Sequence, residues 1–193
     1  MQTITKVYDN HEQARKAVTD LEAAGIPSSE ISLLANKAVS AKYADVDEAS
    51  PTATGAGVGA VVGSSAGLLA GLGLLAIPGL GPIVAAGWLA STAVGAIAGS
   101  ATGGLLGALV DSGVSEDHAH VYSEAVRRGG TLLSVRTDDG RAEKVRSVLD
   151  RYQPIDPDLL GADYRKTGWK QFDPNAAPYE VTEREQESQR LRR

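Results

Sequence analysis

Residues 55–107 read GAGVGAVVGSSAGLLAGLGLLAIPGLGPIVAAGWLASTAVGAIAGSATGGLLG, and this stretch decides how the rest of the chain is interpreted. It lies inside a run of 62 residues, from 49 to 110, that contains no charged side chain. The run holds 15 of the 22 glycines, although charged residues make up 22% of the whole chain. The chain therefore divides into an uncharged centre and two charged flanks.

Small residues recur at every fourth position in this centre, on both sides of a proline–glycine turn. The first series is Gly55, Gly59, Gly63, Gly67 and Gly71, and the second is Gly87, Ser91, Gly95, Gly99, Gly103 and Gly107. A period of four keeps small residues on one helix face, where they let two backbones pack closely. The spacing predicts a glycine-zipper hairpin of two helices, about Gly55–Ala76 and Ile83–Val110. The turn would lie at Pro78, Gly79, Gly81 and Pro82.

The environment of this hairpin has two alternatives, lipid or another copy of the chain. At 1.5 Å per residue the helices would be about 33 and 42 Å long, enough to cross a hydrocarbon core of about 30 Å. The flanks carry acidic rather than basic residues, and Trp88 is the run's only aromatic residue. These two features weaken the case for membrane insertion. The alternative is a soluble homo-oligomer in which the hairpins pack between subunits.

The flanks each contain a strand followed by an amphipathic helix. Thr3–Asp9 predicts a strand, Asn10 a helix cap, and Glu30–Ala35 a second strand. The buried face of that first helix would carry Ala14, Ala17, Val18 and Leu21. After the run, Ser115 predicts the cap of a short helix and Thr131–Thr137 a strand. A last helix, capped by Asp138 or Asp139, would bury Ala142, Val145, Leu149 and Tyr152.

The two flanks are also similar in sequence. A shift of 128 positions superposes Thr3 on Thr131, Val7 on Val135, Ala14 on Ala142, Lys16 on Lys144 and Leu21 on Leu149. An internal duplication and a shared amphipathic composition explain these matches equally well.

The expected fold class is α+β, with two ferredoxin-like split βαβ halves that form a four-stranded antiparallel sheet covered by helices on one face. The fourth strand would lie at the sheet's edge near Ile155–Leu160, because Pro154 and Pro157 exclude a central position. The domain plan is 1–48 and 111–160 for the two halves, 49–110 for the inserted hairpin and 161–193 for a polar tail. This tail would be either disordered or anchored by Tyr164, Trp169, Phe172 and Tyr179.

Few residues offer catalytic chemistry. The absence of cysteine excludes disulfides, thiolate metal sites and cysteine nucleophiles, and a net charge of −5 argues against nucleic-acid binding. No signal peptide is expected at the N-terminus. Gly71–Ala76 matches a dinucleotide fingerprint only formally, because no strand precedes it. His118 and His120 lie two residues apart and would point to different sides of a helix, so no metal is expected, and His11 would have a capping or surface role.

Two segments resemble a known family. TITKVYDNHEQARKAVTDLEAAGIPSSEISLLA (3–35) looks like the N-terminal module of bacterial heat-induced or general stress proteins of the YflT type. GALVDSGVSEDHAHVYSEAVRRGGTLLSVRT (107–137) resembles relatives that carry a glycine-zipper insert, and the tail with Tyr164, Gly168, Trp169 and Phe172 is similar to theirs. The resemblance implies a bacterial, stress-associated role and no active-site residues.

These observations predict a non-enzymatic protein without a cofactor. Its hairpin would associate with the bacterial inner membrane, facing the cytoplasm, or drive self-assembly in the cytoplasm. The alternatives are a ligand-sensing module in a soluble oligomer, for which a polar concavity between the two halves would be the favourable sign, and a pore-like assembly.

Overall fold

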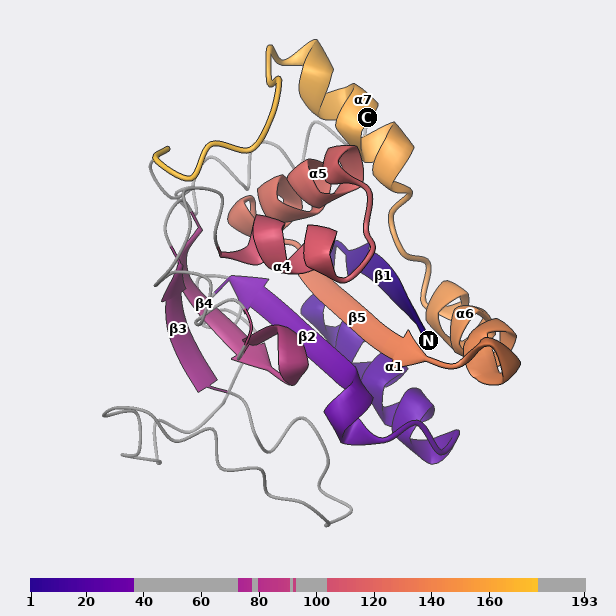
Figure 1. The fold of residues 1–193 in the computed structure, drawn as a ribbon. Coiled ribbons are helices and arrows are strands. Elements are labelled where there is room, and N and C mark those ends of the chain that lie inside the picture. The colour runs from indigo at the N-terminus through magenta and orange to yellow at the C-terminus, as the bar shows by residue number, and fades with distance from the viewer. Residues whose placement is uncertain (37–72, 78–79, 91, 93–103, 177–193) are drawn as a thin grey trace.

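The computed structural model describes residues 1–36, 73–77, 80–90, 92 and 104–176, which form a mixed α+β fold around one antiparallel sheet (Figure 1). The strands are β1 (Gln2–Tyr8), β2 (Ile31–Asn36), β3 (Gly73–Ile77), β4 (Gly81–Ala86) and β5 (Thr131–Thr137). The helices are α1 (His11–Ala23), α4 (Leu105–Asp111), α5 (Glu116–Arg127), α6 (Asp139–Arg151) and α7 (Pro157–Lys166), and a 3-10 turn, η1 (Ser28–Glu30), precedes β2.

The strands predicted at 3–9, 30–35 and 131–137 and the helices with caps at Asn10, Ser115 and Asp138 are confirmed. The side chains of Asn10, Ser115 and Asp138 each accept a hydrogen bond from a backbone N–H in the first turn of the following helix. Each cap satisfies an N–H group that has no partner inside its helix. The predicted inner faces of α1 and α6 are buried, with Tyr152 partly buried beside them. Short-range signals were therefore sufficient for these elements.

The sheet is covered on both faces, so the expectation of helices on one face was wrong. The core beneath α1 and α6 contains Ile4, Leu33 and Leu133, whereas Val7 and Leu132 belong to the core beneath α4, α5 and α7. In Figure 1, α4 and α5 lie in front of the sheet and α1 lies behind it. All six residues of β2 are buried, as expected for a strand with helices on both sides.

Two segments of the uncharged run, β3 and β4, form strands in place of most of the helical residues predicted there. β3 and β4 are antiparallel neighbours, and β4 also pairs with β2, with Leu34 opposite Ala85. The prediction of helices about Gly55–Ala76 and Ile83–Val110 is therefore wrong for 73–76 and 83–86, whereas 88–90 and 105–110 are helical as predicted. A glycine-rich helix gives up about 1 kcal/mol for each glycine relative to alanine, whereas pairing with β2 satisfies backbone groups and buries Ile83 and Ala85.

The fourth strand predicted near Ile155–Leu160 is also wrong. Only an isolated bridge joins Ile155 to Val7, with the Ile155 N–H 2.8 Å from the Val7 carbonyl oxygen. Helix α7 begins at Pro157, because Asp156 caps it and proline is favourable in a first helical turn.

The connections form two interleaved split β-α-β units. The strand order is β1-β5-β2-β4-β3, and every neighbouring pair is antiparallel. β1 and β2 are consequently parallel, joined through α1, and separated by β5. β4 and β5 are likewise parallel and separated by β2, with α4 and α5 in their connection.

The strand–helix units β1–α1 and β5–α6 are similar in structure, and their strands pair antiparallel with Thr5 and Ser134 near the middle of the pairing. Thr5 lies opposite Ser134 in the register, and their hydroxyl oxygens are 2.8 Å apart. Helices α1 and α6 begin 128 residues apart, as the predicted repeat requires, but β1 and β5 begin 129 residues apart. The difference arises because Asp9 separates β1 from its cap, whereas Asp138 follows β5 directly. The shift of 128 therefore aligns the helices and misaligns the strands by one residue.

Candidate ligand-binding groove

A surface groove of about 450 Å³ lies where α1 meets the C-terminal end of α6. Its lining comes from both halves of the chain, with six residues of α1 and one that follows α6. The lining residues are His11, Glu12, Arg15, Lys16, Thr19, Asp20 and Tyr152. A polar concavity between the halves is the feature that favours a ligand-binding role, so this groove is the candidate functional site.

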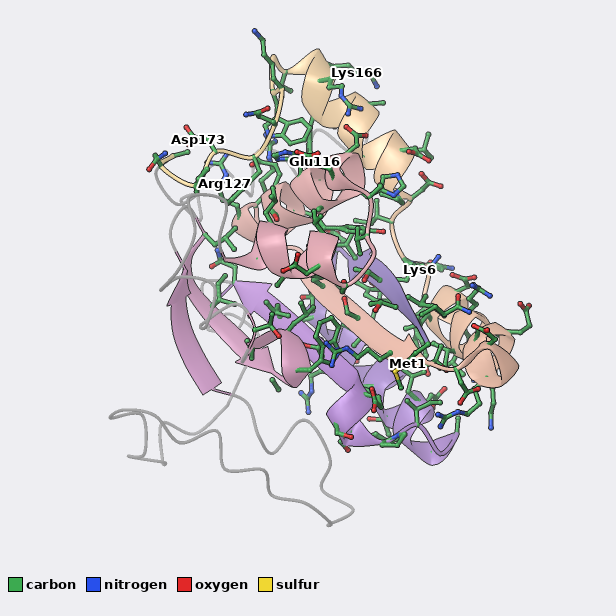
Figure 2. The ribbon with its side chains drawn as sticks, viewed as in Figure 1. Met1, Lys6, Glu116, Arg127, Lys166 and Asp173 are labelled. Carbon is green, nitrogen blue, oxygen red and sulfur yellow. The ribbon has the colours of Figure 1, made fainter. Side chains whose placement is uncertain are left out.

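Tertiary hydrogen bonds hold the two helices at the groove. The Tyr8 hydroxyl, buried beneath both helices, donates to the Leu149 carbonyl at 3.0 Å. The Tyr152 hydroxyl donates to Asp20 at 2.7 Å, and Arg151 pairs with the same carboxylate oxygen at 2.9 Å. Lys6 of β1 forms an ion pair with Asp150 at 2.9 Å, and its position beside α6 is visible in Figure 2. The groove is therefore bounded by elements that are fixed relative to each other.

Two parallel rows of side chains on α1 face this groove. Residues four apart lie above one another on a helix, so Glu12, Lys16 and Asp20 form one row. That row is internally paired, because Lys16 Nζ lies 2.8 Å from Glu12 Oε1. The ion pair lowers the pKa of Glu12 and raises that of Lys16. The hydrogen bond that Tyr152 donates to Asp20 raises the pKa of Tyr152.

The second row is His11, Arg15 and Thr19, and it contains nitrogen atoms without partners in the part of the chain that the structure describes. Thr19 donates its hydroxyl to the Arg15 carbonyl at 3.2 Å, but no ion pair or hydrogen bond of the Arg15 guanidinium is found there. His11 is 5% exposed, and its Nδ1 is buried without a hydrogen-bond partner. Burial, with a smaller contribution from the positive charge of Arg15, lowers the pKa of His11. The ring is therefore neutral near pH 7.

Sequence reasoning missed this groove. It assigned His11 to a capping or surface role and did not propose Arg15, Lys16 or Asp20 as site residues. The available signal was the spacing of 11, 15 and 19 on one helix face, which is also typical of any solvated helix. Tyr152 was predicted as part of a helix's inner face, and only the packing of α6 on α1 reveals that it borders a groove.

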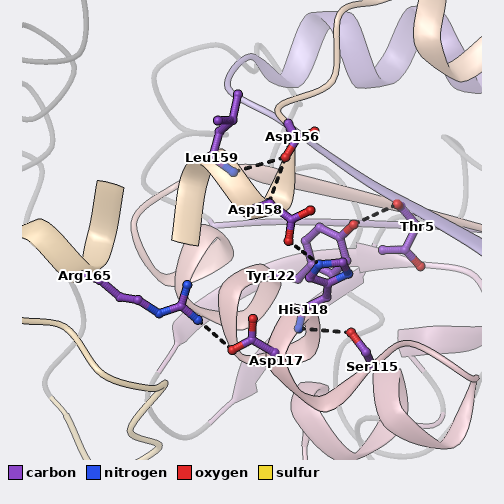
Figure 3. A network of polar contacts seen from close by, with 9 residues as sticks. All are labelled: Thr5, Ser115, Asp117, His118, Tyr122, Asp156, Asp158, Leu159 and Arg165. Carbon is purple, nitrogen blue, oxygen red and sulfur yellow. Dashed lines mark hydrogen bonds and ion pairs between the residues drawn. The ribbon is translucent and has the colours of Figure 1, made fainter. Parts of the chain in front are cut away.

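A second polar network joins α5 to α7 (Figure 3). His118 Nε2 lies 3.0 Å from Asp158 Oδ1, and Arg165 pairs with Asp117 at 2.7 Å. The Tyr122 hydroxyl donates to the Thr5 carbonyl at 3.1 Å, next to the isolated bridge at Val7. These contacts hold α7 against α5 and cover part of the outer edge of β1.

The two histidines of α5 have different partners. His118 pairs with α7, whereas His120 Nδ1 accepts a hydrogen bond from the Phe172 N–H at 3.2 Å. Within the described ranges no group of three or more metal-ligating side chains is found. Phe172 and Tyr164 are buried and Trp169 packs beside them, so these residues anchor the start of the tail. Tyr179 lies outside the described residues.

A fully buried carboxylate connects α5 to its surroundings. Glu124 is 0% exposed, and its Oε1 lies 2.7 Å from Arg127 and 2.6 Å from Arg128. The Arg128 guanidinium stacks on the Tyr164 ring at 4.1 Å, and the Asn36 amide donates to the carbonyls of Arg127 and Leu80. The cluster joins β2, α5, α7 and the turn before β4, which makes it a structural junction.

The predicted helix-packing and turn residues fall into four groups. Gly87 follows β4 with a φ of +87°, and a Cβ there would lie 2.1 Å from the Ile31 carbonyl oxygen, so it serves close contact with β2 rather than helix packing. Gly107 lies in α4. Gly81 and Pro82 lie in β4, and the predicted turn connects two strands. The following residues lie outside the described part of the chain: Gly55, Gly59, Gly63, Gly67, Gly71, Pro78, Gly79, Ser91, Gly95, Gly99 and Gly103.

Across residues 1–36, 73–77, 80–90, 92 and 104–176, no helix has both the length and the apolar character required to cross a membrane. This finding does not extend to the rest of the uncharged run.

Comparison of the chain with protein-family models, with curated protein sequences and with solved structures produces no match in any of the three. The functional interpretation therefore depends on the residues themselves.

Proposed function

We propose that this protein is a non-enzymatic binding module that senses a small polar ligand in the groove between α1 and α6. The proposal is carried by the residues that line the groove, which come from both halves of the chain. The side chains of one row on α1 are paired with each other, as in the Glu12–Lys16 ion pair, whereas the row with Arg15 has no ion pair among the described residues. Binding across the helices would add contacts between the two halves and stabilise the folded state.

A thermal-shift screen of bacterial metabolites tests this proposal on the full chain. Thr19→Trp places a large side chain in the groove, and Glu143→Trp places one on α6, where the Glu143 side chain is 92% exposed and outside the groove. We expect at least one small polar molecule to raise the Tm of the wild type and of the Glu143 variant, but not of the Thr19 variant. A screen without any such molecule would count against the proposal.

Self-association through the uncharged run is a second candidate, supported by the edges of the sheet. At the β1 edge, the Thr5 and Val7 carbonyls accept hydrogen bonds from Tyr122 and Ile155. At the opposite edge, β3 is uncharged, and no other described strand pairs with its outer side. Unprotected edge strands favour pairing with another chain.

Sedimentation velocity of the full chain tests this second candidate. We expect an oligomer that Ala76→Lys disrupts, because a charge on an edge strand opposes strand pairing. Gly63→Leu combined with Gly95→Leu tests close packing in the run itself. Carbonate-washed membrane fractions and liposome leakage test the membrane and pore alternatives, and a wild-type monomer absent from washed membranes would contradict all three.

We also propose a role in bacterial stress responses and a ferredoxin-like arrangement of the sheet. The resemblance of 3–35 and 107–137 to general stress proteins supports the role, and the two interleaved split β-α-β units support the arrangement. Quantitative proteomics of the native bacterium before and after heat shock tests the role, and unchanged abundance under heat and ethanol stress would contradict it.

A further inference from the structure

We infer that the groove recognises a carboxylate group of its ligand, held between the Arg15 guanidinium and the His11 ring. This inference rests on the proposed function and adds the chemical class of the ligand. It follows from which groups of the groove already have partners and which do not.

The acidic groups of the groove are already satisfied. Glu12 is paired with Lys16, and Asp20 accepts hydrogen bonds from both Tyr152 and Arg151. A ligand cation would therefore have to compete with existing partners. The Arg15 guanidinium, with no partner among the described residues, offers donors in a fork that matches a carboxylate.

His11 provides a second contact point, one turn before Arg15 on the same helix face. Its ring is almost completely buried, and Nδ1 lies against the protein without a partner. Nε2 also has no hydrogen bond to the described residues, but unlike Nδ1 it is accessible to solvent. We therefore assign Nε2 as the ring nitrogen that faces the groove. His11 is also the first residue of α1, where the helix dipole favours a negative charge.

The charges around Arg15 favour a carboxylate over a phosphate. Two carboxylates, Glu12 and Asp20, line the same groove and would repel a doubly charged group more strongly than a singly charged one. The Tyr152 ring offers an apolar surface for the remainder of the ligand. A monocarboxylate with a small apolar body fits these features.

Bound carboxylate must also change the titration of His11. The positive charge of Arg15 contributes to the low pKa of this histidine. An anion between the two side chains would offset that charge and favour the protonated imidazole, so the pKa of His11 rises when the anion is bound. By linkage, the anion then binds more tightly as the pH falls through the titration range of His11.

Benzoate and its neutral isostere benzamide form a matched pair of probes, with inorganic phosphate as the competing anion. Titrations of the isotope-labelled full chain would follow the amide signals of α1 and the imidazole signals of His11 by NMR. Arg15→Gln removes the charge at the site. Arg141→Gln removes an exposed arginine that pairs with Asp138 at the start of α6, away from the groove, and serves as the control.

We expect saturable benzoate binding that Arg15→Gln weakens about tenfold or more, as for a lost hydrogen bond to a charged group. Arg141→Gln should bind benzoate as the wild type does, and the pKa of His11 should rise with bound benzoate. Equal binding of benzamide, tighter binding of phosphate, unchanged affinity in the Arg15 variant or no benzoate binding would overturn the carboxylate assignment. A groove-dependent hit of another class in the metabolite screen would still support the proposed function.

Discussion

Among the glycines that the structure describes, Gly87 is the one at which an added Cβ would make the shortest contact. Its φ of +87° disfavours any side chain, and a Cβ would lie 2.1 Å from the Ile31 carbonyl oxygen. Gly25 has nearly the same φ, +86°, but a Cβ at that position would have no atom within 4 Å. A comparison of alanine substitutions at the two glycines therefore distinguishes the cost of the backbone conformation, which both share, from the cost of the steric clash, which only Gly87 has.

We predict that Gly87→Ala lowers the free energy of unfolding by at least about 3 kcal/mol, whereas Gly25→Ala costs about 1 kcal/mol. Urea denaturation of both variants measures the difference. Equal losses would show that the contact between Gly87 and β2 relaxes freely.

Glu124 is the residue most dependent on its charged partners. Its carboxylate is fully buried between Arg127 and Arg128, and neutralising it leaves two nearly buried guanidinium groups without this counter-charge. We predict that Glu124→Gln destabilises the protein by about 3–5 kcal/mol. Asp117→Asn breaks the exposed pair with Arg165 and should cost no more than about 1 kcal/mol. Chemical denaturation of the two variants checks the contrast, and similar losses would contradict it.

Two buried tyrosines make the fold sensitive to alkali. Burial, with smaller contributions from Asp156 and Asp158, raises the pKa of Tyr122 to about 12. Burial beneath α1 and α6 raises the pKa of Tyr8 as well. In the unfolded chain both lose their protons near pH 10, so above that pH the unfolded state binds fewer protons than the folded state and stability falls.

We predict that the free energy of unfolding falls above about pH 10 by as much as about 1.4 kcal/mol per pH unit for each of these tyrosines. Tyr122→Phe should remove the contribution of Tyr122 to this alkaline slope. At pH 7 the same substitution should lower the free energy of unfolding by about 1 kcal/mol, because the hydrogen bond to Thr5 is lost. Denaturation between about pH 7 and about pH 11.5, a range that brackets the titration of tyrosine in the unfolded chain, measures the slope. An identical alkaline slope in this variant would contradict the prediction.

At the scale of elements, local signals predicted the strands and helices of the flanks up to α6, but they failed for 73–76 and 83–86 in the centre. Caps at Asn10, Ser115 and Asp138 and the spacing of apolar residues depend on neighbours along the chain. Whether 81–86 forms a helix or a strand depends on the unpaired edge of β2, which no local pattern contains. The groove depends in the same way on α6 packing against α1.

The adjacent apolar residues Leu33 and Leu34 of β2 did contain a usable signal. Leu33 and Leu34 are both buried, in cores on opposite faces of the sheet. A sheet covered on one face would alternate buried and exposed positions, so adjacent leucines indicate burial on both faces. This pattern argues against a sheet that helices cover on one side only, and it does not bear on the order of the strands.

Helix α7 docks on α5 through a close contact at Gly161. A Cβ at this position would lie 2.9 Å from Val121 Cγ2. We predict that Gly161→Ala loosens α7 and that Val121→Ala, in the same chain, restores part of the lost docking by making room. Hydrogen exchange of the α7 amides measures the loosening. Purely additive effects of the two substitutions would exclude a direct contact as the cause.

At the scale of the whole molecule, the part of the uncharged run that the structure describes is packed into the domain. Leu80, Ile83 and Leu89 are fully buried, in the same core as residues of α4 and α5. The Ser32 hydroxyl donates to the Ala86 carbonyl at 2.9 Å and accepts the Leu89 N–H at 3.2 Å. The two charged halves and this part of the run therefore form one structure, with the groove at the seam between the halves.

Residues 73–77 and 81–86 complete the sheet of the domain and are not part of a free helical hairpin. Carbon-13 secondary chemical shifts of the full chain in solution test this arrangement most directly, because they distinguish strand from helix residue by residue. The account predicts strand values over 73–77 and 81–86, with cross-strand contacts from Leu34 to Ala85. Continuous helical values across either segment would contradict it.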